Sequence, residues 1–149
     1  MIFATLIGLV TFVLASSVHY FASMRLHQHL NHKTKSGLPS VLLGILGAGF
    51  AHLTEAALYV AGFLLLAALD LGGFKGGEAS GLMELFYFSL VNYTSIGLGD
   101  IYPTGHSRFL AGLKSLNGFL LISCSASFIF LVMRKQMGEA KAGGIQSSD

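Results

Sequence analysis

Residues 94–100 read Thr-Ser-Ile-Gly-Leu-Gly-Asp, and this stretch determines how the rest of the chain is interpreted. Its glycines, Gly97 and Gly99, stand at alternate positions. Glycine adopts positive φ without the steric cost of a β-carbon, so alternate glycines suit a ribbon whose backbone alternates in hand. Such a ribbon points consecutive carbonyl oxygens to one side, which is the arrangement that a dehydrated cation needs. One chain supplies only one wall, and closure requires rotational symmetry between copies.

The chain around this stretch is too apolar for an ordinary soluble domain. Of its 149 residues, 53% are hydrophobic and only 11% are charged, whereas soluble domains carry about 25% charged residues. A small domain buries only part of its surface, so a bilayer is the expected environment. The net charge of +2 and the lack of a basic stripe argue against a nucleic-acid partner, and one cysteine excludes an internal disulfide.

Three apolar stretches are long enough to cross a membrane as helices, because about 20 apolar residues span the hydrocarbon core. We expect helices over 2–24, 39–69 and 107–134. The second is longer than the bilayer requires and should tilt. A signal peptide is the alternative for the first stretch, but it lacks a basic start and another membrane helix follows it.

A fourth apolar segment, 81–93, is too short to span and suits a re-entrant helix. The loop 25–37 carries three basic residues, and three more lie at and after the end of the third stretch. Only Lys75 and Arg108 lie on the other side. Basic loops stay in the cytoplasm, which predicts an external N-terminus and a cytoplasmic C-terminus. Segment 81–93 must then enter and leave by the outer face.

With Tyr-Phe-Ser-Leu-Val-Asn-Tyr at 87–93 before it and Ile-Tyr-Pro-Thr-Gly at 101–105 after it, the motif resembles the pore loop of potassium channels. The resemblance covers about 39–134. It implies an all-α membrane protein with an outer helix, a re-entrant pore helix, a selectivity filter and an inner helix, assembled as a homotetramer. The expected divisions are an N-terminal transmembrane helix at 1–24, a cytoplasmic basic linker at 25–37, a pore domain at 38–134 and a cytoplasmic tail at 135–149.

The resemblance implies a multi-pass protein of the plasma membrane that conducts K⁺ passively, with the lipid bilayer and K⁺ as partners and no nucleic acid. Carbonyls of the first four filter residues would bind K⁺, the Ser95 hydroxyl would complete the innermost site, and Asp100 would lie at the outer mouth. The implied filter is Ser95, Ile96, Gly97, Leu98 and Gly99, supported by Thr94, Asp100, Tyr87 and Phe88.

Two filter residues depart from the family pattern. Ser95 stands where threonine is usual, and Leu98 replaces a tyrosine whose ring bonds to the pore helix. A weakly selective cation channel and a non-conducting accessory subunit are therefore alternatives to a K⁺-selective channel.

Two residues of the third stretch are also informative. Gly118 lies near its middle and is interpreted as a hinge of the inner helix or as a site of close packing, which small residues permit in membranes. Lys114 stands where related inner helices often carry glutamate. We expect it to extend toward the outer surface or to pair with an acid such as Glu84.

The second stretch contains His52 and Glu55, one turn apart on one helix face. Glu55 falls near the middle of the span, where an ionised carboxylate costs about 2.5 kcal/mol or more. His19 approaches them if the first two helices pack together. The three residues form either a structural polar cluster or a pH sensor, because histidine titrates in the physiological range. They do not make a catalytic constellation, and we expect no enzyme and no cofactor, with K⁺ only as the permeant ion.

Overall fold

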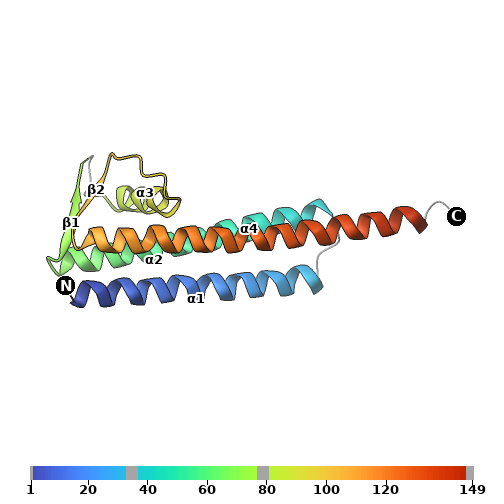
Figure 1. The fold of residues 1–149 in the computed structure, drawn as a ribbon, viewed down its shortest axis with the longest axis horizontal. Helices are drawn as coiled ribbons and strands as arrows, with labels where there is room; N and C mark the ends of the chain where they lie inside the picture. Colours follow the sequence, from blue (N-terminus) through green and yellow to red (C-terminus); the bar gives the residue numbers. More distant parts are fainter. Residues whose placement is uncertain (1, 33–36, 77–80, 147–149) are drawn as a thin grey trace.

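The computed structural model describes residues 2–32, 37–76 and 81–146. Three long helices lie side by side, and a short helix and a two-stranded sheet lie beside them at one end (Figure 1). The N-terminus lies at the end of the molecule that carries the sheet, and the C-terminus lies at the opposite end. The helices are α1 (Ile2–His32), α2 (Leu38–Ala68), α3 (Leu82–Tyr93) and α4 (Ser107–Gln146).

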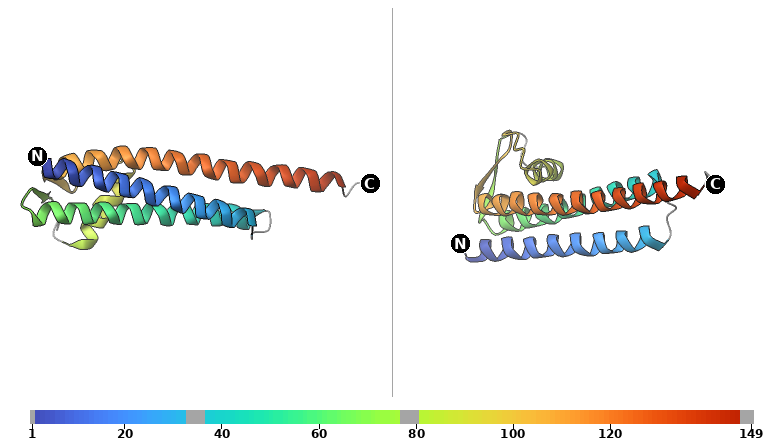
Figure 2. Two further views of the ribbon diagram at one scale, coloured as in Figure 1. Left: turned by 90° about the horizontal axis from the view of Figure 1, so that it is seen from below. Right: turned by 45° about the vertical axis from the view of Figure 1, so that its right-hand side comes forward.

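The three long helices are those expected to cross the membrane. Within the described residues, α1, α2 and α4 each contain a segment long and apolar enough to span, with mean hydropathies of 2.0, 1.6 and 2.0. Each of them contacts the other two, as the views of Figure 2 also show. The prediction of an all-α membrane fold is confirmed.

A two-stranded antiparallel sheet brackets the re-entrant segment between α2 and α4, and it was not predicted. Strand β1 (Gly72–Lys75) pairs with β2 (Tyr102–Gly105), with Gly72 opposite Gly105. Strand β1 packs closely on β2 and on the start of α4, since a β-carbon at Gly72 would lie 2.8 Å from the Thr104 carbonyl oxygen and 2.6 Å from Ser107 Oγ. Because the two strands are paired, the chain between them leaves and returns at the same end of the bundle. The structure thus gives α3 the re-entrant path that the charge distribution predicted.

Two helices are longer than predicted. Helix α1 continues to His32, into the predicted linker 25–37, whose residues 33–36 lie outside the described part of the chain. Helix α4 continues to Gln146, through most of the predicted tail. Neither extension contains proline. Residues 25–32 include arginine, leucine and glutamine, and residues 135–146 include lysine, glutamine, glutamate and alanine, all of which favour helix. Polarity alone did not mark the ends of these helices.

Aromatic side chains pack α3 and strand β1 against α2. Phe63 of α2 is fully buried. Its ring centroid lies 5.1 Å from that of Phe74 on β1 and 5.6 Å from that of Phe88 on α3, in edge-to-face geometry. Phe74 and Phe88 complete the triangle at 4.9 Å. Such pairs add about 0.5–1.5 kcal/mol beyond their buried area, so this cluster anchors the re-entrant segment.

Candidate functional site: the pore loop and its support

The predicted filter is an extended ribbon that follows α3. The φ angle is +60° at Ser95, +57° at Gly97 and +77° at Gly99, so every second residue lies in the left-handed region. This is the alternation in hand that the two glycines predicted, and the structure adds Ser95 to it. Residues 94–100 are all exposed in the single chain. The ribbon therefore has the backbone of a carbonyl-lined wall and lacks the opposing walls.

The outer end of the ribbon is tied back to α3. The Tyr87 hydroxyl donates a hydrogen bond of 2.8 Å to Asp100 Oδ2, and Asp100 Oδ1 accepts one of 3.0 Å from the Ile101 amide. The hydrogen bond to Asp100 raises the pKa of the Tyr87 phenol. Tyr87 thus lies beside the predicted filter, whereas Phe88 faces away from it and packs on Phe63. The Thr94 hydroxyl donates to the Val91 carbonyl and closes the last turn of α3.

The C-terminal end of α3, which leads into the inner end of the ribbon, is bonded to α4. Asn92 Nδ2 donates to the Ala111 carbonyl at 2.8 Å, and the Ser115 hydroxyl donates to the Asn92 carbonyl at 3.0 Å. A β-carbon at Gly118 would lie 2.1 Å from the Tyr93 carbonyl oxygen, closer than atoms can approach. Gly118 therefore lets the inner helix touch the end of α3. Of the two interpretations of this glycine, the structure supports close packing, and α4 is one continuous helix through it.

Lys114 does not lie where the sequence placed it. It is fully buried, its ammonium group donates to the Ser89 hydroxyl, and it lies over the rings of Tyr59 and Tyr93 at 5.1 and 5.8 Å. The expectation that it extends outward or pairs with Glu84 is wrong, because the ion pairs of the described residues do not include it. Cation–π attraction is worth about 2 kcal/mol when water is excluded, which helps to hold this cation inside the bundle.

The polar cluster predicted from α1 and α2 is assembled, and it includes one further residue. Glu55 is fully buried and accepts hydrogen bonds from His19 Nδ1 at 2.8 Å and from His52 Nδ1 at 3.0 Å. The Tyr93 hydroxyl also donates to Glu55 Oε2. Sequence reasoning missed Tyr93. The available signal was a phenol at the end of the pore helix, since buried tyrosine hydroxyls seek a polar partner.

The cluster has the composition of a metal site, and its polar atoms also bond to one another. Ligand atoms of His19, His52 and Glu55 all lie within 4.8 Å of one another. Each of these three atoms already has a hydrogen-bond partner inside the cluster. The arrangement therefore functions as a hydrogen-bond network, and we assign no metal to it.

A second polar contact ties α1 to the bundle beside this cluster. Asn117 of α4 is fully buried, and its Nδ2 donates to the Tyr59 hydroxyl at 2.9 Å and to the Phe12 carbonyl at 3.2 Å. The Ser16 hydroxyl donates to Asn117 Oδ1 at 3.3 Å. Polar groups thus cross-link α1, α2 and α4 at the depth of the filter's inner end.

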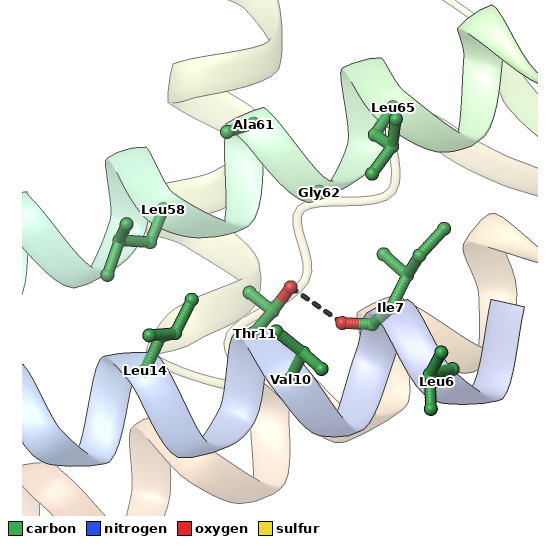
Figure 3. A pocket seen from close by; sticks show the side chains of 9 residues that line it. All are labelled: Leu6, Ile7, Val10, Thr11, Leu14, Leu58, Ala61, Gly62 and Leu65. Carbon is green, nitrogen blue, oxygen red and sulfur yellow. Dashed lines mark hydrogen bonds between the residues drawn. The ribbon is translucent and has the colours of Figure 1, made fainter. Parts of the chain in front are cut away.

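An apolar groove of about 280 Å³ between α1 and α2 offers no chemistry (Figure 3). Its one polar side chain, Thr11, donates to the Ile7 carbonyl at 2.8 Å within its own helix. The other side chains around it are aliphatic, as suits a surface that faces lipid. The lining residues are Leu6, Ile7, Val10, Thr11, Leu14, Leu58, Ala61, Gly62 and Leu65.

Comparison with known proteins agrees with this geometry. A family model described as ion channel matches residues 41–135, more than half of the chain. The match contains nearly all of α2, the re-entrant segment with its ribbon, and α4 as far as Lys135, and it leaves α1 outside. No curated protein and no solved structure matched the chain. The chain therefore belongs to the ion channel family, as a two-transmembrane-type channel domain preceded by one extra N-terminal helix.

Proposed function

We propose that this chain is one subunit of a homotetrameric channel that conducts K⁺ passively and selectively. The observation that carries the proposal is the left-handed φ at Ser95, Gly97 and Gly99 in an ion-channel family member. In this conformation the carbonyls of residues 95–98 replace the hydration shell of K⁺. Such a channel needs neither a cofactor nor a catalytic residue.

The exposure of the ribbon supports assembly around a fourfold axis. Irregular backbone at membrane depth is stable only where protein or a water-filled cavity surrounds it. In the single chain, however, Ile96 is 68% exposed and Leu98 is 62% exposed. On α4, Phe119 and Phe130 are likewise 66% and 63% exposed. Symmetric copies would enclose the ribbon and cover this face of the inner helix.

Electrostatics favours a cation at both ends of the ribbon. The C-terminus of α3, which carries partial negative charge, leads directly into residues 94–99. The Asp100 carboxylate lies beyond the other end. We place that outer end, the two-stranded sheet and the N-terminus outside the cell and the C-terminus in the cytoplasm. The reason is that the basic residues concentrate toward the end of the bundle that lies away from the sheet.

A weakly selective cation channel is the second candidate, and Leu98 favours it. An aliphatic side chain cannot donate the hydrogen bond by which a tyrosine would brace the ribbon. Bracing of the outer ribbon then depends on the bond between Tyr87 and Asp100.

Ion flux into liposomes separates these candidates. The purified protein should pass K⁺ much faster than Na⁺, and Ba²⁺ should block it, because Ba²⁺ matches K⁺ in size and binds the same oxygens more strongly. Equal K⁺ and Na⁺ flux without Ba²⁺ block would establish the weakly selective channel instead. A protein that passes neither ion would be an accessory subunit.

A further inference from the structure

The carboxylate of Glu55 gathers hydrogen-bond donors from three helices. His19 comes from α1, His52 from α2 itself and Tyr93 from α3. Glu55 is fully buried, and His19 and Tyr93 are 5% and 3% exposed. An ionised carboxylate only accepts hydrogen bonds, so both Nδ1 atoms and the phenol carry their protons in this arrangement. Both oxygens of a charged Glu55 therefore have hydrogen-bond donors.

Charged and titratable groups surround Glu55 on several helices. His19 faces it from α1, His52 and Tyr59 from α2, Tyr93 from α3 and Lys114 from α4, the last over the rings of both tyrosines. Lys114 donates to the Ser89 hydroxyl, and the ion pairs of the described residues do not join it to Glu55. A proton taken up by this cluster adds a positive charge in a buried site, where water screens it poorly and its effect on neighbouring groups is strong.

Proton uptake also disturbs the hydrogen bonds themselves. A protonated Glu55 presents a hydroxyl where three donors now converge, so one of them loses its acceptor. A proton on His19 has to enter at Nε2, which is buried and has no hydrogen-bond partner among the described residues. His52 is the most accessible member, with 19% of its side chain exposed. Its Nδ1 lies 2.9 Å from the Tyr93 oxygen, so a charge there acts on Tyr93 directly.

Tyr93 connects this network to the filter in two ways. It is the last residue of α3, and only Thr94 separates it from Ser95, the first residue of the ribbon. Its carbonyl oxygen is the atom that a β-carbon on Gly118 would strike. A change in how the Tyr93 side chain is held is therefore passed to the inner end of the ribbon and to the inner helix.

We propose that His19, His52, Glu55 and Tyr93 form a proton-binding site that reduces conduction when it takes up a proton. Two effects act in the same direction. The added positive charge repels K⁺ at the inner end of the filter. The altered bonding of Tyr93 weakens the attachment of the end of α3, which leads into the ribbon. The proposal rests on the channel function proposed above and adds its regulation.

The test is K⁺ flux into liposomes as a function of pH between about 5 and 8, the range in which histidine titrates. Wild-type flux should fall as the pH falls through this range. Glu55→Gln, His52→Gln and Tyr93→Phe should each flatten the curve or shift its midpoint by about one pH unit. His29→Gln, which changes an exposed histidine on α1 outside the cluster, should leave the curve unchanged.

Histidine NMR on the same protein in lipid nanodiscs supplies a readout that does not depend on flux. The ring resonances of the cluster histidines should move over the same pH interval in which flux falls, and that interval should change in Tyr93→Phe. Flux curves that coincide for wild type and all three cluster variants in a conducting channel would overturn the proton site alone. Absence of K⁺ flux at every pH would overturn the proposed function, while the NMR titration would still decide whether the cluster binds a proton.

Discussion

The two ends of the filter ribbon are held in different ways. At the outer end, one exposed hydrogen bond joins Asp100 to Tyr87 within the same re-entrant segment. At the inner end, Tyr93 is buried and contacts Glu55 and His52 of α2 and Lys114 of α4. Glu55 in turn bonds to His19 of α1. The outer attachment is exposed to solvent and stays within the re-entrant segment. The inner attachment belongs to a network that includes residues of all three long helices. Changes at the inner end should therefore have larger and more distant effects.

The ribbon between the two ends sets the largest effect. Gly97→Ala should reduce K⁺ flux to background while the tetramer still assembles. The φ of +57° is costly for a residue with a β-carbon, by about 1 kcal/mol in each subunit. Nothing lies within 4 Å of the added carbon in the single chain, so steric contact within the subunit does not contribute. Liposome flux and native mass measurement check the two parts, and selective flux in this variant would refute the filter assignment.

The next largest effect is expected at the contact between α4 and the end of α3. Gly118→Ala inserts a carbon against the Tyr93 carbonyl, and overpacking of this kind costs about 1–3 kcal/mol. We expect a loss of K⁺ flux of about tenfold or more, together with a lower unfolding temperature in detergent.

Gly112 provides the matched control on the same helix. Nothing lies within 4 Å of a β-carbon at this position. Gly112→Ala should leave flux unchanged and can stabilise α4 by up to about 1 kcal/mol. Equal effects of the two substitutions would show that the contact with Tyr93 is unimportant.

Removal of the central acceptor tests the inner attachment itself. Glu55→Leu removes the shared acceptor of His19, His52 and Tyr93. His52 and Tyr93 can still bond to each other, but His19 Nδ1 loses its acceptor, and a buried unsatisfied group costs about 1–3 kcal/mol. The free energy of unfolding should fall by more than it does for Glu55→Gln, which keeps one acceptor oxygen. Thermal unfolding of both variants in detergent measures the difference. If both were as stable as wild type, the network would not hold the bundle together.

The smallest effect is expected at the outer end. Tyr87→Phe removes one exposed hydrogen bond, worth about 0.5–1.5 kcal/mol, and keeps the ring. The ratio of K⁺ to Na⁺ flux should fall by about tenfold at most, and the unfolding temperature should not change. A loss of stability as large as that of Glu55→Leu would remove the distinction between the two ends.

The features that could be predicted from the sequence are those that local pattern controls. Hydropathy marked the three spans, the basic residues required a re-entrant segment, and alternate glycines indicated a ribbon of alternating hand. His19 could be placed near Glu55 because packing of neighbouring helices brings a buried acid toward the available donors. The family match and the structure support these inferences.

The features that could not be predicted depend on contacts between distant parts of the chain. The two-stranded sheet pairs Gly72 with Gly105, and neither strand has an alternating pattern long enough to predict the pairing. The burial of Lys114 depends on two aromatic rings and the Ser89 hydroxyl, which come from α2 and α3. The polar stretches after residues 24 and 134 looked like a linker and a tail because helix propensity does not require an apolar face.

The most direct test of the central claim is the reversal potential of single channels with K⁺ on one side of a bilayer and Na⁺ at equal concentration on the other. Filter carbonyls at Ser95, Ile96, Gly97 and Leu98 that replace the hydration shell of K⁺ predict a zero-current voltage far toward the K⁺ equilibrium value. A zero-current voltage near zero, with measurable current in both directions, would contradict the account.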